Sequence, residues 1–448
     1  MRRRFAAAPA VLAMCAVLIG VNGVVAAPPA ATFTDPVRLG FEAGDDWEPS
    51  IAADSDGNVY ALWTHYVGFE GGATGEVDPT CPQCPSPHMV IQISHDNGAT
   101  WEAPHALAPS EERQDDPQIV VDAGDGTTVY AAYMEGDKSS MFVARSDTSG
   151  ATFEPVLTEE IQRGLDKIAL AARDGHVYLV YHSQQKIWAS VSHDRGESWT
   201  VSQPVHNTNS TFGVSLPSGA AIAPNGDAYF AWNGVNRPGQ AKGTKTLYVT
   251  KTADGGATWT TSVVDQSQAA RPCDCGGWDY WGAQMTIGVD DAGRVHVMWN
   301  ATDVRSGPQR MLFASSGDGG VTWSPPLDVS QAPPGANNLF PAMVVDGAGD
   351  VRVAWQDDRN GFDAGGDDPD ARWNTYYRHS TDGGLTWSPE TQLSAWVDGY
   401  DYKFEDGYLQ PYGDYFELDI NADGKTVALW GEGFSYVGPG NVWYATEE

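Results

Sequence analysis

The sequence is poor in basic residues. It has 26 lysines and arginines against 59 aspartates and glutamates, which gives a net charge of −33. Nucleic acids and anionic membrane surfaces attract clustered positive charge, so this chain would repel both. It would also repel acidic substrates unless arginines gather at one place. Most of the excess charge is typical of a solvated acidic surface.

Long apolar runs are missing everywhere except at the N-terminus. Residues 1–26 combine three arginines, an apolar run from Val11 to Val25 and small residues before Pro28, the pattern of a secretory signal peptide. The run is short for a membrane-spanning helix, so an uncleaved anchor is the less favoured alternative. We therefore expect a secreted protein, extracellular or periplasmic, and not an integral membrane protein.

Cysteine is scarce. Beyond the signal peptide only Cys81, Cys84, Cys273 and Cys275 occur. An even number of cysteines in an exported chain favours disulfides. Cys-x-x-Cys is also the spacing of metal ligands, so a four-thiolate metal site is the alternative. The sequence leaves the pairing open, because four cysteines allow three connectivities.

Several common chemical motifs are also missing. The chain has no Gly-rich phosphate loop and no Gly-x-Ser-x-Gly elbow, so nothing favours nucleotide binding or serine-hydrolase chemistry. The acidic run Asp357–Asp370 lacks an EF-hand pattern, and it is either a possible Ca²⁺ site or a solvated loop. No cofactor is required. His65, His88 and His182 have no ligand spacing, so each is expected to be structural.

What the sequence has instead is a repeated turn, Ser/Thr-x-Asp-x-Gly-x-Thr-Trp. In such a turn Asp accepts backbone N–H groups, Gly supplies a positive φ, and Thr-Trp begins a returning strand. It occurs at residues 94–101, 192–199, 252–259, 316–323 and 380–387, with a degenerate copy at 146–153 in which Thr148 replaces the aspartate.

A second repeat sets the number of units. Seven glycines each follow one apolar run and open another that ends in an aromatic residue six or seven positions later. These pairs are Gly57–Trp63, Gly126–Tyr133, Gly175–Tyr181, Gly226–Trp232, Gly293–Trp299, Gly349–Trp355 and Gly424–Trp430. Each unit therefore contains four short strands. This pattern predicts an all-β fold, a β-propeller of four-stranded antiparallel blades, with seven blades favoured over six.

The seventh unit ends after its third strand. Thr32–Val37 resembles the segment that follows a repeat turn, so we expect the N-terminal strand to supply the missing fourth strand and close the ring. Residues 32–446 then form a single domain. Residues 159–172 could also be drawn as an amphipathic helix, but the repeat register favours strands.

The loops between second and third strands, and the crossovers between blades, share one face of a propeller. Aromatic and acidic residues concentrate there, which is typical of carbohydrate sites. The expected substrate-binding residues are Arg359, Asp357, Asp358, Trp278, Tyr280, Trp281 and Tyr412.

The repeated turn resembles the Asp box of the bacterial neuraminidase repeat (sialidase, or BNR) proteins, and the resemblance extends over nearly all of the mature chain. It implies a sialidase-like propeller in which the boxes lie away from the catalytic face. Sialidases of this kind use a tyrosine nucleophile with a carboxylate partner, an aspartate acid/base, and three arginines that bind the substrate carboxylate.

Tyr415 stands eight residues before the Asp423–Gly424 turn, as the family's nucleophile does, so the resemblance implies that role. A packed or ligand-stacking tyrosine is the alternative. The family's first arginine precedes the first blade in a Phe/Tyr-Arg-Ile-Pro segment, where this chain has Trp47-Glu48-Pro49-Ser50. Because Glu48 would repel a substrate carboxylate, the substitution argues against ordinary sialidase activity.

We therefore hypothesise a secreted, monomeric, glycan-directed protein. If it is an enzyme, we expect a glycoside hydrolase of the exo-α-sialidase type, acting on sialosides or related glycans. Its catalytic candidates are Tyr415, Glu48, Asp46 and Glu432. The alternative is a non-catalytic propeller that binds glycans or a protein partner.

Overall fold

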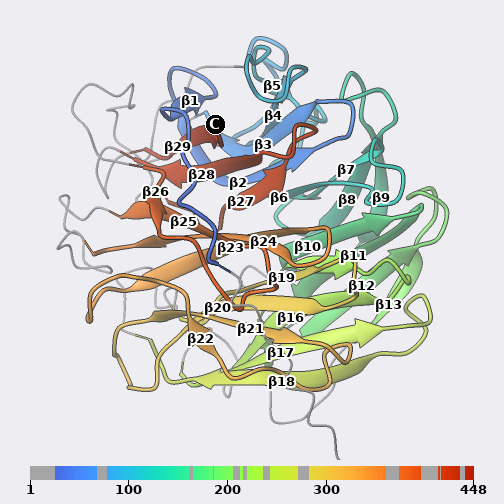
Figure 1. Cartoon of the computed structure of the whole chain (residues 1–448). Helices are drawn as coiled ribbons and strands as arrows, with labels where there is room; N and C mark the ends of the chain where they lie inside the picture. Colours follow the sequence, from blue (N-terminus) through green and yellow to red (C-terminus); the bar gives the residue numbers. More distant parts are fainter. Residues whose placement is uncertain are drawn as a thin grey trace, which may run out of the picture.

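We analysed a computed structural model of the chain. It describes residues 26–67, 78–160, 165–184, 186–204, 212–214, 219–235, 243–270, 282–359, 373–394, 412–413, 415–433 and 439–448. These residues contain no helix, and hence none that is long and apolar enough to cross a membrane. Their strands form seven antiparallel sheets around a common centre, so the prediction of an all-β, seven-bladed propeller is confirmed (Figure 1).

Each blade runs from an inner strand at the channel to an outer strand at the rim. Blade one contains β2 (Asp45–Ala53), β3 (Val59–Tyr66), β4 (His88–Ser94) and β5 (His105–Ala106). Blade two contains β6 (Gln114–Val121), β7 (Val129–Glu135), β8 (Ser140–Ser146) and β9 (Glu154–Glu160). Blade three contains β10 (Leu165–Arg173), β11 (His176–Ser183), β12 (Lys186–Ser192) and β13 (Thr200–Pro204).

The remaining four blades follow the same plan. They contain β14 (Phe212–Val214), β15 (Ala220–Ile222), β16 (Ala228–Val235), β17 (Lys245–Thr252) and β18 (Thr260–Ser267); β19 (Met285–Val289), β20 (Val295–Ala301), β21 (Arg310–Ser316) and β22 (Leu327–Asp328); β23 (Asn338–Asp346), β24 (Asp350–Asp357), β25 (Asn374–Ser380) and β26 (Thr391–Gln392); and β27 (Glu417–Ile420), β28 (Thr426–Glu432), β29 (Asn441–Thr446) and β1 (Val37–Leu39).

Two details refine the sequence-based description. The inner strand of the fourth blade is split, because β14 and β15 both pair with β16. Residues 159–160 and 165–172, the described part of the alternative helix, belong to β9 and β10, so the strand prediction was correct there.

The second strand of every blade is buried on both faces. Its terminal aromatic residue is at most 1% exposed in all seven blades. Because each sheet is covered by its neighbours, these strands carry apolar residues almost continuously instead of alternating apolar and polar ones. The seven aromatic positions read from the sequence therefore mark the packing layers between blades.

The repeated Asp turns have one hydrogen-bond pattern. In the turn after β25, Asp382 Oδ1 accepts the Thr386 N–H at 2.8 Å, and Oδ2 accepts the Thr386 hydroxyl at 2.7 Å. The Ser380 hydroxyl donates to Asp382 and accepts the Gly384 N–H. The turn also bonds back to its own blade, since the Gly383 N–H donates to the Gly349 carbonyl at 2.9 Å. The Asp turns, which join third and fourth strands, therefore lie at the same end of each blade as the turns that join first and second strands.

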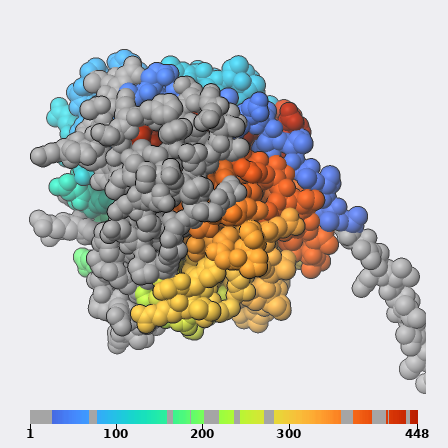
Figure 2. All heavy atoms as spheres, turned by 90° about the vertical axis from the view of Figure 1, so that its left-hand side faces the viewer, coloured from blue at the N-terminus to red at the C-terminus, as the bar shows by residue number. Residues whose placement is uncertain are grey.

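The N-terminus closes the ring. β1 pairs with β29 in antiparallel register, with Val37 opposite Tyr444, and Phe33 makes a further bridge to Glu447. The expected closure is confirmed, although the strand proper begins at Val37. Upstream, the Ala31 carbonyl accepts the Thr391 hydroxyl at 2.7 Å, so the N-terminal segment also contacts the sixth blade, as Figure 2 shows.

A cavity of about 610 Å³ runs along the centre of the ring. Its walls are the inner strands, including residues of β2, β6, β23 and β27. Asp54, Asp122 and Asn421 lie at the end near the Asp turns, and Tyr415 marks the opposite end, where the inner strands begin.

Candidate active site

Four inner strands carry a β-bulge where they begin, at the end of the channel away from the Asp turns. The residue at each bulge has a positive φ: Glu48 (57°), Asp116 (53°), Lys167 (46°) and Phe340 (52°). A left-handed conformation costs a non-glycine residue about 1–3 kcal/mol, and such residues gather at functional sites. Bulges also redirect side chains next to active sites. Three of these four side chains are charged, which makes this end of the channel the candidate site.

The three charged side chains meet. Lys167 Nζ lies 2.8 Å from Glu48 Oε1 and 3.2 Å from Asp116 Oδ1. Lys138 Nζ approaches the other Asp116 oxygen at 3.6 Å. Glu48, Asp116 and Lys167 are all buried. We call Glu48, Asp116, Lys138, Lys167 and Tyr415 the channel-mouth cluster.

Buried charges are stable only when they are compensated. Burial disfavours the ionised form of Asp116, but the ammonium groups of Lys138 and Lys167 outweigh it and hold the pKa of Asp116 below its usual range. Burial likewise opposes the charge on Lys138, and Asp116 and Asp166 outweigh it, so the pKa of Lys138 is raised. Asp116 is therefore ionised at neutral pH and is unsuited to act as a general acid.

Tyr415 lies beside these carboxylates. Its hydroxyl donates to the Pro117 carbonyl at 2.9 Å, and Lys167 Nζ lies 5.8 Å from the centre of its ring. Burial, together with the negative charges of Glu48 and Asp116, raises the pKa of Tyr415 well above its usual value. The phenol is thus protonated at neutral pH, and it can become a nucleophile only if a nearby base accepts its proton.

A glycine is required next to Glu48. Gly413 has a φ of 67°, and a Cβ atom at this position would lie 2.9 Å from the backbone nitrogen of Glu48. A side chain here would strain the backbone and displace Glu48.

Glu417 lines the channel at the start of β27, two residues after Tyr415. Its carboxylate accepts hydrogen bonds from the Ser50 hydroxyl at 2.5 Å and the Gln118 amide at 2.9 Å. Burial raises the pKa of Glu417 to about 7, and it has the same effect on Asp419, two residues further along β27. A carboxyl that titrates near neutral pH is suited to proton transfer, and sequence reasoning did not select either residue.

The other predicted catalytic carboxylates bond to core side chains. Asp46 Oδ1 accepts the Trp63 indole N–H at 2.9 Å and lies 2.6 Å from His65 Nδ1. Glu432 accepts the Trp430 indole N–H at 3.0 Å. Each carboxylate thereby satisfies an indole that would otherwise be buried without a partner.

Of the predicted substrate-binding residues, Arg359 is held by two carboxylates. It bonds to Asp357 at 2.6 Å and to Glu390 at 2.6 Å, and its guanidinium stacks 3.6 Å above the Tyr376 ring. Asp358 accepts both the backbone N–H and the side-chain amide of Asn337.

Tyr412 belongs to the apolar core. Its ring stacks on Trp373 with 4.8 Å between centroids, and its hydroxyl accepts the Trp373 backbone N–H at 3.0 Å. The other predicted aromatics, Trp278, Tyr280 and Trp281, lie outside the described residues.

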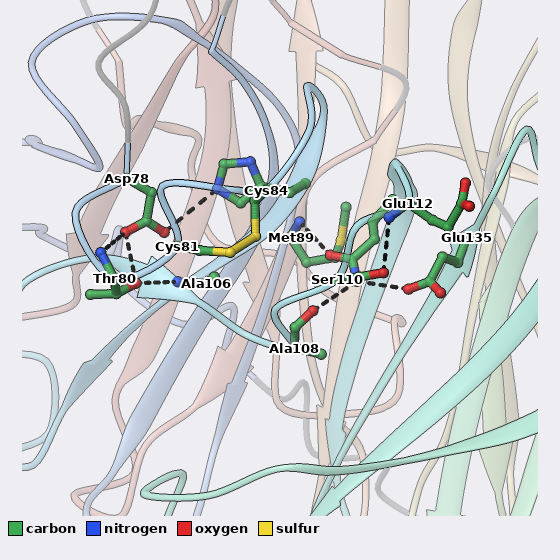
Figure 3. The surroundings of a disulfide bond; sticks show 12 residues. Asp78, Thr80, Cys81, Cys84, Met89, Ala106, Ala108, Ser110, Glu112 and Glu135 are labelled. Carbon is green, nitrogen blue, oxygen red and sulfur yellow. Dashed lines mark hydrogen bonds and ion pairs between the residues drawn. A yellow bond between two sulfur atoms is a disulfide. The ribbon is translucent and has the colours of Figure 1, made fainter.

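One of the expected disulfides is present. Cys81 and Cys84 are joined, with 5.4 Å between their Cα atoms (Figure 3). Cys273, Cys275 and residues 360–370 of the acidic run lie outside the described residues. In the part of the chain that is described, no three His, Cys, Asp or Glu side chains are arranged to hold a metal ion.

Sequence reasoning brought Tyr415 and Glu48 to the same site but missed the lysines and Glu417. A signal for the bulges was present: Glu48, Asp116 and Phe340 each precede a proline, at Pro49, Pro117 and Pro341. Lys167, which is followed by Ile168, lacks this signal.

Comparison with known proteins supports the architecture. Residues 42–269, just over half of the chain, match the BNR repeat-like domain family. No curated protein matches the sequence.

Three solved structures illustrate the structural likeness. A Dyadobacter fermentans protein of unknown function is 16% identical (TM-score 0.49; 94% of this chain and 100% of that one). A polysaccharide lyase, PL25 ulvan lyase, is 11% identical (TM-score 0.50; 91% and 95%). The Trypanosoma rangeli sialidase is 13% identical (TM-score 0.44; 94% and 59%). At these identities the likeness concerns the fold alone.

Proposed function

The chain belongs to the BNR repeat-like domain family, and we propose that it is a glycan-directed enzyme whose reaction centre is the channel-mouth cluster. The observation that carries this proposal is the position of Tyr415. A buried phenol lies beside carboxylates of two other blades, at the end of the channel opposite the Asp turns. Strained backbone at Glu48 and Asp116 holds these carboxylates in place.

The proposed reaction is glycoside hydrolysis with Tyr415 as the nucleophile. Glu48 accepts the phenolic proton as Tyr415 attacks the anomeric carbon, and the protonated carboxyl of Glu417 gives its proton to the leaving oxygen as the glycosidic bond breaks. A water molecule then attacks the anomeric carbon of this aryl glycoside and gives its proton to the Glu417 carboxylate, while Glu48 returns its proton to the phenolate oxygen of Tyr415. Glu417, with a pKa of about 7, is the nearby carboxyl best suited to exchange protons in these steps.

The charge of the cluster favours neutral sugars over acidic ones. Lys138 and Lys167 are already paired with three carboxylates, those of Glu48, Asp116 and Asp166. The described contacts therefore leave an excess of negative charge, which would repel a sialic acid carboxylate. A neutral glycan would not be repelled by this charge.

The test is a substrate panel with matched tyrosine variants. The wild-type protein should release sugar from neutral glycosides faster than from α-sialosides. Tyr415→Phe should lower turnover by at least 100-fold while leaving the fold intact. Tyr377→Phe, which removes another buried hydroxyl, one bonded to Thr426 at 2.9 Å, should keep wild-type activity. Unchanged turnover in Tyr415→Phe would exclude it as the nucleophile, and preferential cleavage of sialosides would refute the neutral-sugar preference.

A second candidate function is a non-catalytic glycan-binding propeller. The specific observation in its favour is that Lys167 is paired within the protein and that the Tyr415 hydroxyl already donates to a backbone carbonyl. Glycan binding without turnover on any member of the panel would support this function instead.

A further inference from the structure

The loop that leads from β3 into β4 ends in two consecutive turns. The Cys81 N–H donates to the Asp78 carbonyl at 3.1 Å, and the Cys84 N–H donates to the Cys81 carbonyl at 3.0 Å. These turns gather Asp78, Cys81 and Cys84 at one end of the loop, where the two cysteines form the disulfide (Figure 3). The chain then enters β4 at His88.

Asp78 and His88 are both 1% exposed and incompletely bonded. Thr80 donates its N–H and its hydroxyl to Asp78 Oδ1, each at 2.7 Å. The other oxygen, Oδ2, forms an ion pair with His88 Nε2 at 3.5 Å, but neither of these two atoms makes a hydrogen bond of normal geometry. A buried polar group without a hydrogen bond costs about 1–3 kcal/mol, so a buried pair that lies this far apart requires an explanation.

We propose that reduction of the Cys81–Cys84 disulfide turns this loop into a tetrahedral site for a zinc-like transition-metal ion. The four ligands are the thiolates of Cys81 and Cys84, His88 Nε2 and Asp78 Oδ2. Cys-x-x-Cys is a ligand spacing for zinc, which binds cysteine sulfur, histidine nitrogen and carboxylate oxygen. The metal would lie between Asp78 Oδ2 and His88 Nε2, and the two thiolates would complete its coordination.

The site is gated by the redox state of the loop. In the oxidised chain the two sulfurs are bonded to each other, and the described residues contain no metal-ready group of three ligands. A dithiol reductant transfers two electrons and two protons to the disulfide and is itself oxidised to a disulfide. The two cysteine thiols that form then lose two protons as the metal binds.

The test uses Co²⁺ as a spectroscopic probe on the full chain. Protein reduced with a phosphine, which ends as the phosphine oxide after taking an oxygen atom from water, is titrated beside the oxidised protein. Only the reduced protein should develop the ligand-field bands of tetrahedral cobalt and a thiolate-to-cobalt charge-transfer band, with one ion per chain. Bound metal should also protect Cys81 and Cys84 from alkylation, as measured by mass spectrometry.

Four variants identify the ligands. Asp78→Asn keeps the acceptor for Thr80, and it should weaken binding by at least the roughly 10- to 100-fold that loss of an outer-shell partner already costs. His88→Gln should do the same. His182→Gln is the matched control, because its imidazole also lacks partners but lies on β11 in the third blade. The double variant Cys273→Ser/Cys275→Ser removes the other thiols and should bind cobalt as the wild type does.

Three results would overturn the proposal. One is a reduced protein, verified by its thiol count, that gives no tetrahedral cobalt spectrum. Another is a disulfide that cannot be reduced in the folded protein, since the two cysteine thiolates would then never be available as ligands. The third is loss of the spectrum in Cys273→Ser/Cys275→Ser with retention in Asp78→Asn and His88→Gln, which would show a four-thiolate site instead.

Discussion

At the scale of single residues, Lys167 is the most informative side chain of the channel-mouth cluster. It is the buried cation that bridges Glu48 and Asp116, two carboxylates from different blades. Removing one partner of a buried ion pair leaves uncompensated charge and typically costs about 3–5 kcal/mol. We expect Lys167→Met to lower the free energy of unfolding in urea by this amount at pH 7.

The matched control is Lys251→Met. Lys251 also forms a close ion pair, 2.6 Å from Asp227, but its side chain is 25% exposed. Ion pairs in contact with water contribute about 0–1 kcal/mol. Equal losses in the two variants would mean that the channel-mouth cluster is better hydrated than its burial indicates.

Two carboxyls of the channel wall make stability depend on pH. Burial raises the pKa of Glu417 and of Asp419 to about 7, from ordinary values of 4.5 and 3.8. Because the folded state binds these protons more tightly, their contribution to stability is complete below the ordinary pKa values and is lost as the pH rises to about 7. Both side chains are partly exposed to the channel, so we expect each to account for on the order of 1–3 kcal/mol between pH 5 and pH 8.

Urea denaturation at pH 5 and pH 8 measures this effect. In Glu417→Gln and Asp419→Asn the fall in stability with pH should be smaller, whereas Glu197→Gln, which changes a surface carboxylate, should keep the wild-type slope. The quantity to compare is the change in the free energy of unfolding with pH, not its absolute value. An amide at position 417 loses a hydrogen bond from Ser50 or Gln118, and this loss lowers stability at every pH. Wild-type slopes in both channel variants would contradict the assignment.

The residues of the candidate site were only partly predictable. Tyr415 and Glu48 occupy positions that correspond to the nucleophile and the first arginine of the family that the repeats resemble, so both could be selected from the sequence. Lys167 joins them because the bulge at the start of β10 redirects its side chain, and this bulge lacks the proline that follows the other three bulge residues. Lys138 reaches Asp116 from the turn between β7 and β8, where nothing in the sequence indicates a role. The roles of Asp46 and Glu432 depend on the indole groups that they accept, which is a property of packing.

At the scale of elements, each Asp turn is held mainly by hydrogen bonds among its own residues. In each complete turn the aspartate accepts at least one backbone N–H and two hydroxyls, one from the serine or threonine on either side of it. These bonds lower the pKa of Asp194 and of Asp318 to about 2. This local chemistry explains why the turns could be recognised in the sequence, whereas the number of blades came from the seven glycine–aromatic pairs. The split inner strand of the fourth blade carries no comparable local signal, so it was not predicted.

The degenerate turn of the second blade allows a direct test. Thr148 occupies the aspartate position, and its single hydroxyl accepts the Thr152 N–H at 3.0 Å and also contacts the Thr152 hydroxyl. Thr148→Asp would supply a separate oxygen for each of these donors. We expect a higher urea midpoint at pH 7, and this gain should disappear as the pH falls below the pKa of the new carboxyl.

The reverse change in a complete turn is the control. Asp318→Thr should lower the urea midpoint at pH 7, because its carboxylate bonds to Thr322 in the same way. If Thr148→Asp left the midpoint unchanged while Asp318→Thr lowered it, the second blade would have compensated for its missing carboxylate by other contacts.

At the scale of the whole molecule, stability depends on ring closure by a strand from the opposite end of the chain. Leu39 of β1 is 4% exposed and packs in a core cluster with Leu429 and Val442 of the seventh blade. Truncating a buried leucine costs about 2–5 kcal/mol, and here it also weakens the strand that covers the edge of β29. We therefore expect Leu39→Ala to lower the free energy of unfolding by at least this amount, in a single transition, because opening one blade interface releases the whole ring.

Leu157→Ala is the matched control, since Leu157 also lies on an outer strand, β9, but is 46% exposed. It should change stability by no more than about 0.5 kcal/mol. An uncovered β29 would present unpaired backbone groups to other chains, so Leu39→Ala should also associate at high protein concentration in sedimentation experiments. A synthetic peptide of residues 30–41 should suppress this association by occupying the edge. A Leu39→Ala protein that stayed monomeric and lost no more stability than Leu157→Ala would show that the seventh blade holds the ring closed without β1.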